Sequence, residues 1–139
     1  MRIMGIDYGD SRIGIAMSDP LGWMAQGIET IEWHDNMKKP VVRIQQLVKE
    51  YGVEKVVVGF PRNMNGTVGP RGEKTLEFVK VLTGYIDIDI MKWDERLSTV
   101  AANRIMHEVG MKTSKKKKVV DQIAAVFILQ GYLNSLGSA

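Results

Sequence analysis

Two short apolar segments at the amino end, residues 2–8 and 12–18, are separated only by Gly9-Asp10-Ser11. A tight turn of this kind joins antiparallel strands. The first segment carries apolar groups at both odd and even positions, which is typical of a strand covered on both faces. The sequence therefore predicts a hairpin whose first strand lies in the interior of a sheet.

The rest of the chain predicts one more strand of this meander, followed by alternating helices and strands. Apolar residues at helical spacing between Pro40 and Gly52 predict a helix, and the apolar run 55–60 predicts a buried parallel strand. The other expected elements are a strand within 25–33, a loop over 62–72, a helix containing Leu76, Val79 and Leu82, a strand over 86–93, a helix from Ser98 to about Gly110 and a helix over 119–136. This order predicts an α/β fold with a mixed sheet and helices on its faces.

The composition narrows the class of protein further. A chain of 139 residues with 45% hydrophobic and 25% charged positions predicts a single globular domain over residues 1–139. The absence of Cys excludes disulfides and Cys-ligated zinc, and it favours an intracellular address. Asp7 interrupts the first apolar run too early for a signal peptide, and no later run approaches the roughly 20 residues of a membrane span. We expect a soluble, cytoplasmic protein without a membrane partner.

Basic residues concentrate in one short segment. Lys and Arg number 19 against 16 acidic residues, so the net charge of +3 accommodates a polyanion without requiring one. Cations placed just before or in the first turn of a helix oppose the helix dipole and repel one another. A solvated basic loop and a contact with phosphate backbones both explain such a cluster. The residues concerned are Lys115, Lys116, Lys117 and Lys118, and the same two interpretations apply to Arg62, Asn65 and Arg71 in the Gly-rich loop.

Two acidic residues occupy positions that need an explanation, one within an apolar strand and one at the carboxyl end of a strand. Asp7 lies in or at the end of an apolar strand, although Asp disfavours strands and is expensive to bury alone. It is either a turn residue of the hairpin or a functional group. Glu95 follows a predicted strand at its carboxyl end, where open α/β sheets bind ligands. An exposed Glu paired with Arg96 or Arg62 explains Glu95 equally well.

Asp121 is the most informative acid of the chain. On a helix it shares one face with Ala125, Ile128 and Tyr132, and this face is expected to pack inward. The alternative is a capping or first-turn Asp, if the helix begins near residue 119. Convergence of all three acids on divalent metal would explain their positions, because Mg²⁺ prefers carboxylate oxygens and such ions promote phosphodiester cleavage.

Several motifs resemble one known family over residues 1 to about 136. They are Gly5-Ile6-Asp7-Tyr8-Gly9, Arg12-Ile13-Gly14-Ile15-Ala16, Ser18-Asp19, Gly59-Phe60-Pro61, Asn65-Gly66, Asp94-Glu95-Arg96-Leu97-Ser98-Thr99 and Val120-Asp121-Gln122-Ile123-Ala124-Ala125. In this order and spacing they resemble the YqgF/RuvX family, a group related to Holliday junction resolvases and assigned to processing of precursor 16S ribosomal RNA.

The resemblance implies an RNase H-like fold with three antiparallel strands, then two parallel strands, and helices on both faces. It also implies that Asp7, Glu95 and Asp121 are catalytic ligands of Mg²⁺ or Mn²⁺, which would activate a water molecule. Arg96 and Ser98 would orient Glu95 or contact substrate, and Arg12 is expected to bind nucleic acid. Related nucleases commonly carry a fourth acid near the last one, whereas alanines occupy those positions here, so one or two metal ions remain possible.

Three classes of function follow. The leading hypothesis is a metal-dependent nuclease that processes precursor ribosomal RNA, and its alternative is a resolvase of branched DNA, which would need a homodimer rather than a monomer. A non-catalytic nucleic-acid-binding factor is less consistent with the three acids, because carboxylates near phosphates weaken binding. A kinase-like ATPase needs two such domains around its nucleotide, which exceeds the length of this chain.

Overall fold

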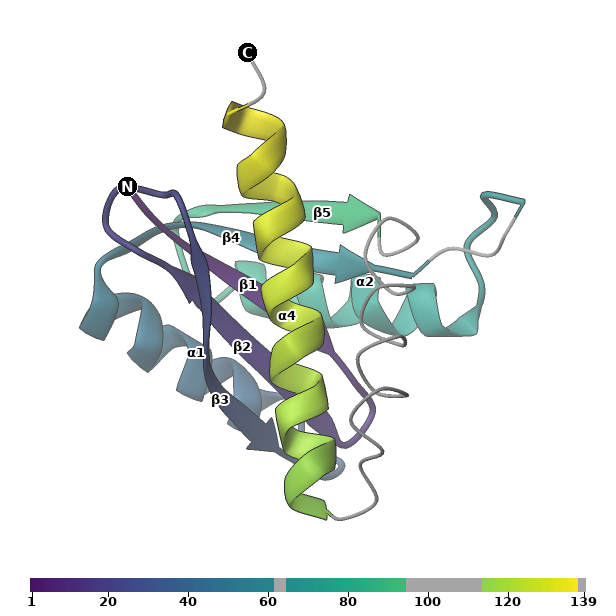
Figure 1. Ribbon diagram of the computed structural model, residues 1–139. Helices are drawn as coiled ribbons and strands as arrows, with labels where there is room; N and C mark the ends of the chain where they lie inside the picture. The colour runs from purple at the N-terminus through teal and green to yellow at the C-terminus, as the bar shows by residue number, and fades with distance from the viewer. Residues whose placement is uncertain (62–64, 95–113, 138–139) are drawn as a thin grey trace.

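The computed structural model describes residues 1–61, 65–94 and 114–137, which build one five-stranded sheet with helices packed on both of its faces (Figure 1). The strands are β1 (Arg2–Tyr8), β2 (Arg12–Ser18), β3 (Ala25–Glu32), β4 (Val53–Phe60) and β5 (Asp89–Asp94), and the helices are α1 (Lys38–Tyr51), α2 (Pro70–Thr83) and α4 (Ser114–Gly137).

The sheet has the strand order β3-β2-β1-β4-β5. Strand β1 pairs antiparallel with β2, and β2 pairs antiparallel with β3. Strands β1, β4 and β5 run parallel to one another. The predicted α/β class, the mixed sheet and the central position of the first strand are therefore confirmed.

Helices α1 and α2 cover one face of the sheet through large side chains. Met4, Ile6 and Tyr8 of β1 point to this side, and Phe78 of α2 is fully buried among them. The rings of Tyr8 and Phe78 stack with centroids 4.7 Å apart. Burial, together with the nearby charges of Asp10 and Glu77, raises the pKa of the Tyr8 phenol above 10.0, so Tyr8 stays neutral at physiological pH.

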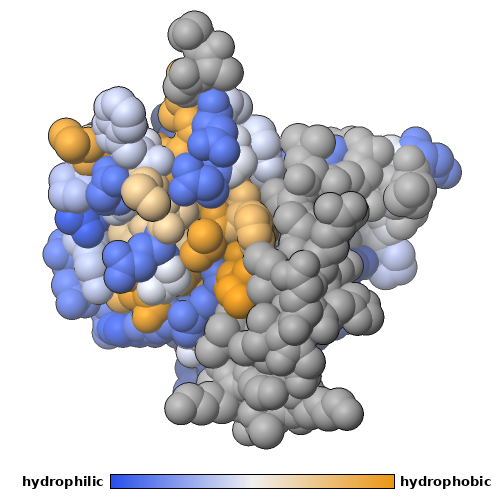
Figure 2. Space-filling model, viewed as in Figure 1, coloured by the Kyte–Doolittle hydropathy of each residue, from blue (hydrophilic) through white to orange (hydrophobic). Residues whose placement is uncertain are grey.

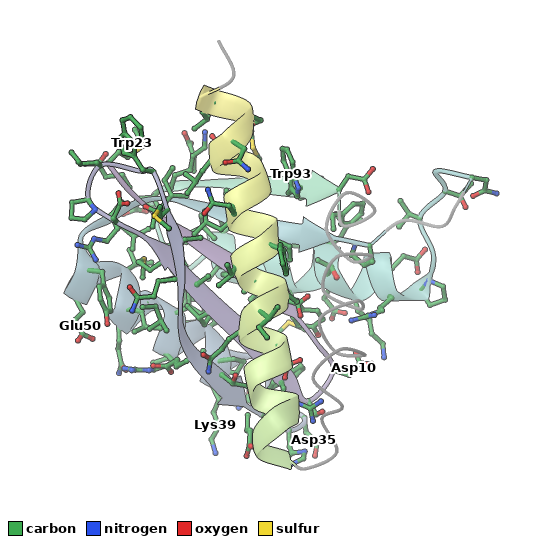
Figure 3. The ribbon with its side chains drawn as sticks, in the orientation of Figure 1. Asp10, Trp23, Asp35, Lys39, Glu50 and Trp93 are labelled. Carbon is green, nitrogen blue, oxygen red and sulfur yellow. The ribbon has the colours of Figure 1, made fainter. Side chains whose placement is uncertain are left out.

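Helix α4 covers the other face through small residues. A Cβ atom at Gly5 of β1 would lie 2.7 Å from Cβ of Leu129, so the helix rests directly on the strand backbone. Ile3, Ala16 and Val57 meet the buried face of α4, whose members are Ala125, Ile128, Leu129, Tyr132 and Leu133. Trp93 of β5 lies against the same helix at Gly131 (Figure 3).

The boundaries of three elements differ from those that the sequence predicts. Helix α2 begins at Pro70, within the expected loop, because Pro is suited to the first helical turn and Gly69 precedes it in an extended conformation. Strand β5 begins at Asp89 rather than 86, because pairing with β4 starts at Lys55 and Asp89. Helix α4 begins at Ser114, five residues before the expected start, and the helix expected from Ser98 lies outside the described residues.

Apolar side chains also reach the surface of the molecule (Figure 2). The turn between β2 and β3 exposes Leu21, Trp23 and Met24 by 80%, 73% and 69%. Within the described part of the chain, none of the helices combines the length and apolarity that a membrane crossing requires.

Candidate active site

Asp7 lies within strand β1 and faces helix α4. Gly5, two residues earlier, approaches Leu129 and Ala125 of α4, and alternate residues of a strand share a face. The carboxylate of Asp7 is therefore placed on the side of the sheet that α4 covers. The alternative interpretation of Asp7 as a turn residue of the hairpin is wrong, since the strand continues to Tyr8.

Asp121 lies in the third turn of α4, directly above strand β2. A Cβ atom at Gly14 would overlap the carbonyl oxygen of Asp121, so the backbones of strand and helix touch here. Gly14 is the Cα partner of Asp7 in the β1–β2 ladder. Because directly paired residues have Cβ positions about 5 Å apart on the same face, Asp7 and the backbone of Asp121 both lie next to Gly14. The alternative of a capping or first-turn Asp is wrong, because the helix begins seven residues earlier.

Arg12 forms an ion pair with Asp121. Its Nε atom donates to Asp121 Oδ2 over 2.7 Å, and the two side chains remain 35% and 17% exposed, respectively. Arg12 opens strand β2 on the same face as Gly14. Arg12, which the sequence analysis expects to bind nucleic acid, thus contacts one of the two acids and holds the Asp121 side chain in place.

The described residues contribute two of the three predicted acids to this site. Strand β5 ends at Asp94, which pairs with Phe60 at the carboxyl edge of the sheet, and Glu95 is the next residue of the chain. Glu95, Arg96, Ser98 and Arg62 lie outside the described residues. In the ranges that the structure does describe, there is accordingly no group of three metal-binding side chains.

The candidate nucleic-acid-binding residues occupy different elements. Asn65 is exposed, and its Oδ1 atom accepts hydrogen bonds from the backbone and hydroxyl of Thr67. Arg71 is exposed in the first turn of α2 rather than in a loop, which corrects the expectation. The backbone of four lysines belongs to the first turns of α4 rather than to a loop before the helix; they are Lys115, Lys116, Lys117 and Lys118. Their side chains lie outside the described part of the structure.

Two further residues that the sequence analysis did not single out position the site. Gly14 allows the close approach of α4, and Gln122 next to Asp121 donates from Nε2 to Thr30 Oγ1 of β3 over 3.2 Å. The alternation of Gly14, Ala16 and Ser18 along one face of β2 was an available signal. Small residues repeated on one face of a strand indicate close approach of another backbone.

A hollow at the opposite end of α4 is chemically unlike this site. It is lined by Met1, Ile3, Leu21, Trp23 and Leu133 among others. In Figure 3, Trp23 marks the end of the sheet with the hollow, and Asp10, which follows β1, marks the end with the acidic site. Since no acidic or basic side chain lines this hollow, the polar end of the sheet remains the candidate for chemistry.

Comparisons with known proteins assign the chain to a family. The family model described as "RuvX: Holliday junction resolvase" matches residues 1–135. The chain belongs to the RuvX family. A relative in Acetivibrio thermocellus, named "Putative pre-16S rRNA nuclease", is 67% identical over 138 residues, covering 99% of this chain and 98% of the relative. A Bacillus subtilis relative with the same name is 49% identical over 137 residues, covering 98% and 99%.

Solved structures support the RNase H-like fold of this RuvX family member. RuvC of T. thermophilus in complex with a Holliday junction substrate is similar with a TM-score of 0.59 and 17% identity, covering 99% of this chain and 96% of RuvC. The large terminase nuclease of phage G20c is similar with a TM-score of 0.50 and 15% identity, covering 95% and 81%. At these identities the likeness concerns the fold alone.

Proposed function

We propose that this protein is a divalent-metal-dependent nuclease that processes precursor 16S ribosomal RNA. The observation that carries the proposal is the position of Gly14, which is the ladder partner of Asp7 and lies against the backbone of Asp121, although the two acids are far apart in the sequence. Arg12 pairs with Asp121, and a divalent cation would offset the remaining negative charge of the acidic residues. The name of a relative that is 67% identical over nearly the full chain supports the assignment of the substrate.

Asp7, Asp121 and Glu95 would hold Mg²⁺ or Mn²⁺. Carboxylate oxygens are the ligands that both ions prefer, and Asp7 and Asp121 provide them at the carboxyl edge of the sheet. Glu95 directly follows the strand that ends at this edge. When bound, the ion supplies a Lewis acid and lowers the pKa of a water molecule. The protein itself holds Asp121 in place through Arg12 and keeps Asp7 on a rigid central strand.

Basic and polar residues around this edge would bind the phosphate backbone. Arg12 lies in the site, and the other candidates are Arg62, Asn65, Arg71, Arg96, Ser98, Lys115, Lys116, Lys117 and Lys118. Phosphate contacts release counterions, so binding should weaken steeply as salt concentration rises. Neutralising the four lysines to Gln should flatten this salt dependence, and an unchanged slope would assign them to a solvated surface.

The test compares cleavage of labelled precursor 16S RNA, single-stranded RNA and a four-way DNA junction, each with Mg²⁺, Mn²⁺ or chelator. We expect metal-dependent cleavage of the precursor RNA by the wild type. Asp7→Asn and Asp121→Asn should abolish cleavage while preserving or strengthening RNA binding, because they remove ligand charge near phosphates. Asp10→Asn is the matched control, since Asp10 lies in the same hairpin, is exposed and pairs with Lys74. Cleavage that survives Asp7→Asn or Asp121→Asn would contradict the metal site.

Cleavage of Holliday junctions is the second candidate. The description of the family model and the RuvC-like fold favour it. Symmetric cleavage of a junction requires two active sites and therefore a homodimer. Sedimentation of the protein with and without a junction, together with the junction arm of the cleavage assay, separates a dimeric resolvase from a monomeric RNA nuclease.

A further inference from the structure

Arg12 uses only part of its guanidinium group in the contact with Asp121. Its Nε atom donates to Asp121 Oδ2 over 2.7 Å. A guanidinium carries five N–H donors, one on Nε and four on the terminal nitrogens Nη1 and Nη2. Among the residues that the structure describes, none accepts a hydrogen bond from Nη1 or Nη2 of Arg12. Four donors are therefore available directly beside Asp121.

Arg43 shows how the same group is used in a purely structural ion pair of this protein. Its Nε and Nη2 atoms bind the two oxygens of Glu29 over 2.9 and 2.7 Å, and its Nη1 atom donates to Gln46 over 3.3 Å. All three nitrogens of Arg43 are thus engaged where α1 meets β3. Arg12 contacts its acid through one nitrogen alone, so holding Asp121 does not account for the whole guanidinium group.

The position of the Arg12 guanidinium is set by a strand and a helix in contact, yet solvent reaches it. Arg12 opens strand β2, and its side chain is 35% exposed, compared with 17% for Asp121. Gly14, two residues later on the same face of β2, lies against the backbone of Asp121. Glu32 is opposite Arg12 in the β2–β3 ladder but is exposed, so water screens its charge. The group is therefore both fixed in place and accessible to a nucleic acid.

Hydrolysis of a phosphodiester creates a need for such donors. The oxygen of a water molecule bonds to phosphorus, one P–O ester bond breaks, the water gives up a proton to solvent and the leaving oxygen takes one up. Negative charge develops on the phosphoryl oxygens during this step, and fixed N–H donors that meet it stabilise the transition state. The planar fork of Arg matches phosphate oxygens, and its charge is permanent, so Arg12 would act without gaining or losing a proton.

We infer that Arg12 is a catalytic residue whose terminal nitrogens bind the scissile phosphate while its Nε atom holds Asp121. The inference rests on the proposed function, because it presupposes that the phosphodiester reacts beside Asp121. It sets Arg12 apart from the other basic residues of the chain. Those residues would bind phosphates along the backbone and contribute to affinity, whereas Arg12 binds the reacting phosphate and contributes to the rate.

The first test observes the guanidinium groups of the full-length protein by ¹H–¹⁵N NMR. A short fragment of precursor 16S RNA is added in EDTA, which prevents metal-dependent cleavage. We expect the Nη resonances of Arg12, assigned by their absence from Arg12→Lys, to shift as RNA saturates the protein. The Nη resonances of Arg43 are the control in the same spectrum and should not shift, because both nitrogens already have partners. RNA binding without a shift at Arg12, or no RNA binding in EDTA, would overturn the inference.

The second test measures single-turnover cleavage at saturating RNA in Mg²⁺. Arg12→Gln should lower the rate constant about 100-fold or more, as expected when a donor to the transition state is lost. The Kd for RNA should rise only a few-fold, because one phosphate contact among several is removed. Arg12→Lys should recover the affinity but little of the rate, since one ammonium group cannot bind both Asp121 and the phosphate in the geometry of a fork. Arg43→Gln is the matched control and should leave both quantities unchanged.

The outcomes separate this inference from the proposed function. Full-rate cleavage by a folded Arg12→Gln, or by Arg12→Lys, would overturn the role of Arg12 while leaving a metal-dependent nuclease intact. No cleavage by the wild type in Mg²⁺ or Mn²⁺ would overturn the proposed function and the inference with it. If Arg12→Gln fails to fold by circular dichroism, the NMR titration of the wild type still decides, because unshifted Arg12 resonances contradict the inference.

Discussion

The two faces of the sheet are packed by opposite means. On the α1 and α2 side, large side chains such as Met4, Ile6 and Phe78 fill the space between helices and strands. On the α4 side, Gly5 and Gly14 allow the helix backbone to touch the strands. The first arrangement buries much apolar surface, which is the main source of stability. The second arrangement fixes the distance between α4 and the sheet and so places the backbone of Asp121 against Gly14, the ladder partner of Asp7.

This difference predicts different responses to mutation on the two faces. A cavity among large side chains costs free energy of unfolding but leaves the helix α4 in place. A single added methyl group between two backbones forces one of them to move. Changes on the α1 and α2 side should therefore affect stability, whereas changes on the α4 side should affect the site.

The largest expected effect on stability is that of Phe78→Ala. Phe78 is fully buried and stacks on Tyr8. Removing the ring should lower the free energy of unfolding by about 3–5 kcal/mol, as measured by urea denaturation. Metal binding by the fraction that remains folded should be unchanged. A parallel loss of Mn²⁺ affinity in the folded protein would show that the two faces are coupled.

Gly14→Ala should give a smaller loss of stability and a larger loss of function. The new Cβ would overlap the Asp121 carbonyl, so α4 must shift, at a cost of about 1–3 kcal/mol. We expect RNA cleavage and Mn²⁺ affinity to fall together. Gly131→Ala is the matched control, because a Cβ at Gly131 of α4 would lie at an ordinary contact distance of 3.4 Å from Trp93 and would leave the helix in place. Equal effects of both substitutions would refute the importance of the backbone contact.

Single hydrogen bonds should contribute similar amounts to the free energy of unfolding on both faces of the sheet. Tyr132→Phe removes the hydroxyl that accepts a hydrogen bond from Lys55 over 2.8 Å on the α4 side. Thr75→Val removes the hydroxyl that donates to the Arg71 carbonyl over 3.0 Å on the other side. Each should lower the free energy of unfolding by about 1 kcal/mol in thermal or urea denaturation. A much larger loss for one of the two would show that the faces differ in more than apolar packing.

The smallest expected effect on stability is that of Asp19, in the turn between β2 and β3. This turn belongs to neither packed face of the sheet and so serves as a reference for both. Backbone N–H groups, first that of Trp23 and then those of Met24, Gly22 and Leu21, hold the pKa of Asp19 below its usual 3.8, while partial desolvation opposes them. A lowered folded pKa contributes stability above the unfolded pKa, and this contribution is lost as pH falls through the folded pKa.

Asp19→Asn should therefore be slightly less stable than the wild type near neutral pH. The difference should shrink as pH falls below the usual pKa of 3.8, because protonation then removes the same charge from the wild type. Thermal melts of both proteins over a series of acidic pH values measure this. A difference that does not depend on pH would assign the effect to the shape of the turn rather than to charge.

Local sequence patterns predicted most of the fold because they report local physics. The hairpin of β1 and β2 followed from two apolar segments and a three-residue turn, and the end of α1 followed from Gly52, which adopts a left-handed conformation with φ of 64°. The start of α4 was predicted five residues too late. The lysines at its beginning disfavour a helix start by their charge, and the packing of the rest of the helix outweighs this local cost.

The candidate site could be predicted only in part. Asp7 and Asp121 were each recognisable as acids in apolar surroundings, and their convergence was a hypothesis that the packing of α4 on β2 supports. The ion pair of Arg12 with Asp121 had no signal in the sequence, because the two residues are 109 positions apart. Such a contact depends on where a helix lies relative to a strand.

The sequence by itself determined the elements of this protein, their order and the sheet class, because hydrophobic periodicity and turn residues act over a few neighbouring positions. Family membership followed from motifs in a fixed order. Only the tertiary structure decided which charges meet. Which charges meet depends on the distance of α4 from β1 and β2. This distance is set by close contacts at Gly5 and Gly14 with helix residues that are far away in the chain.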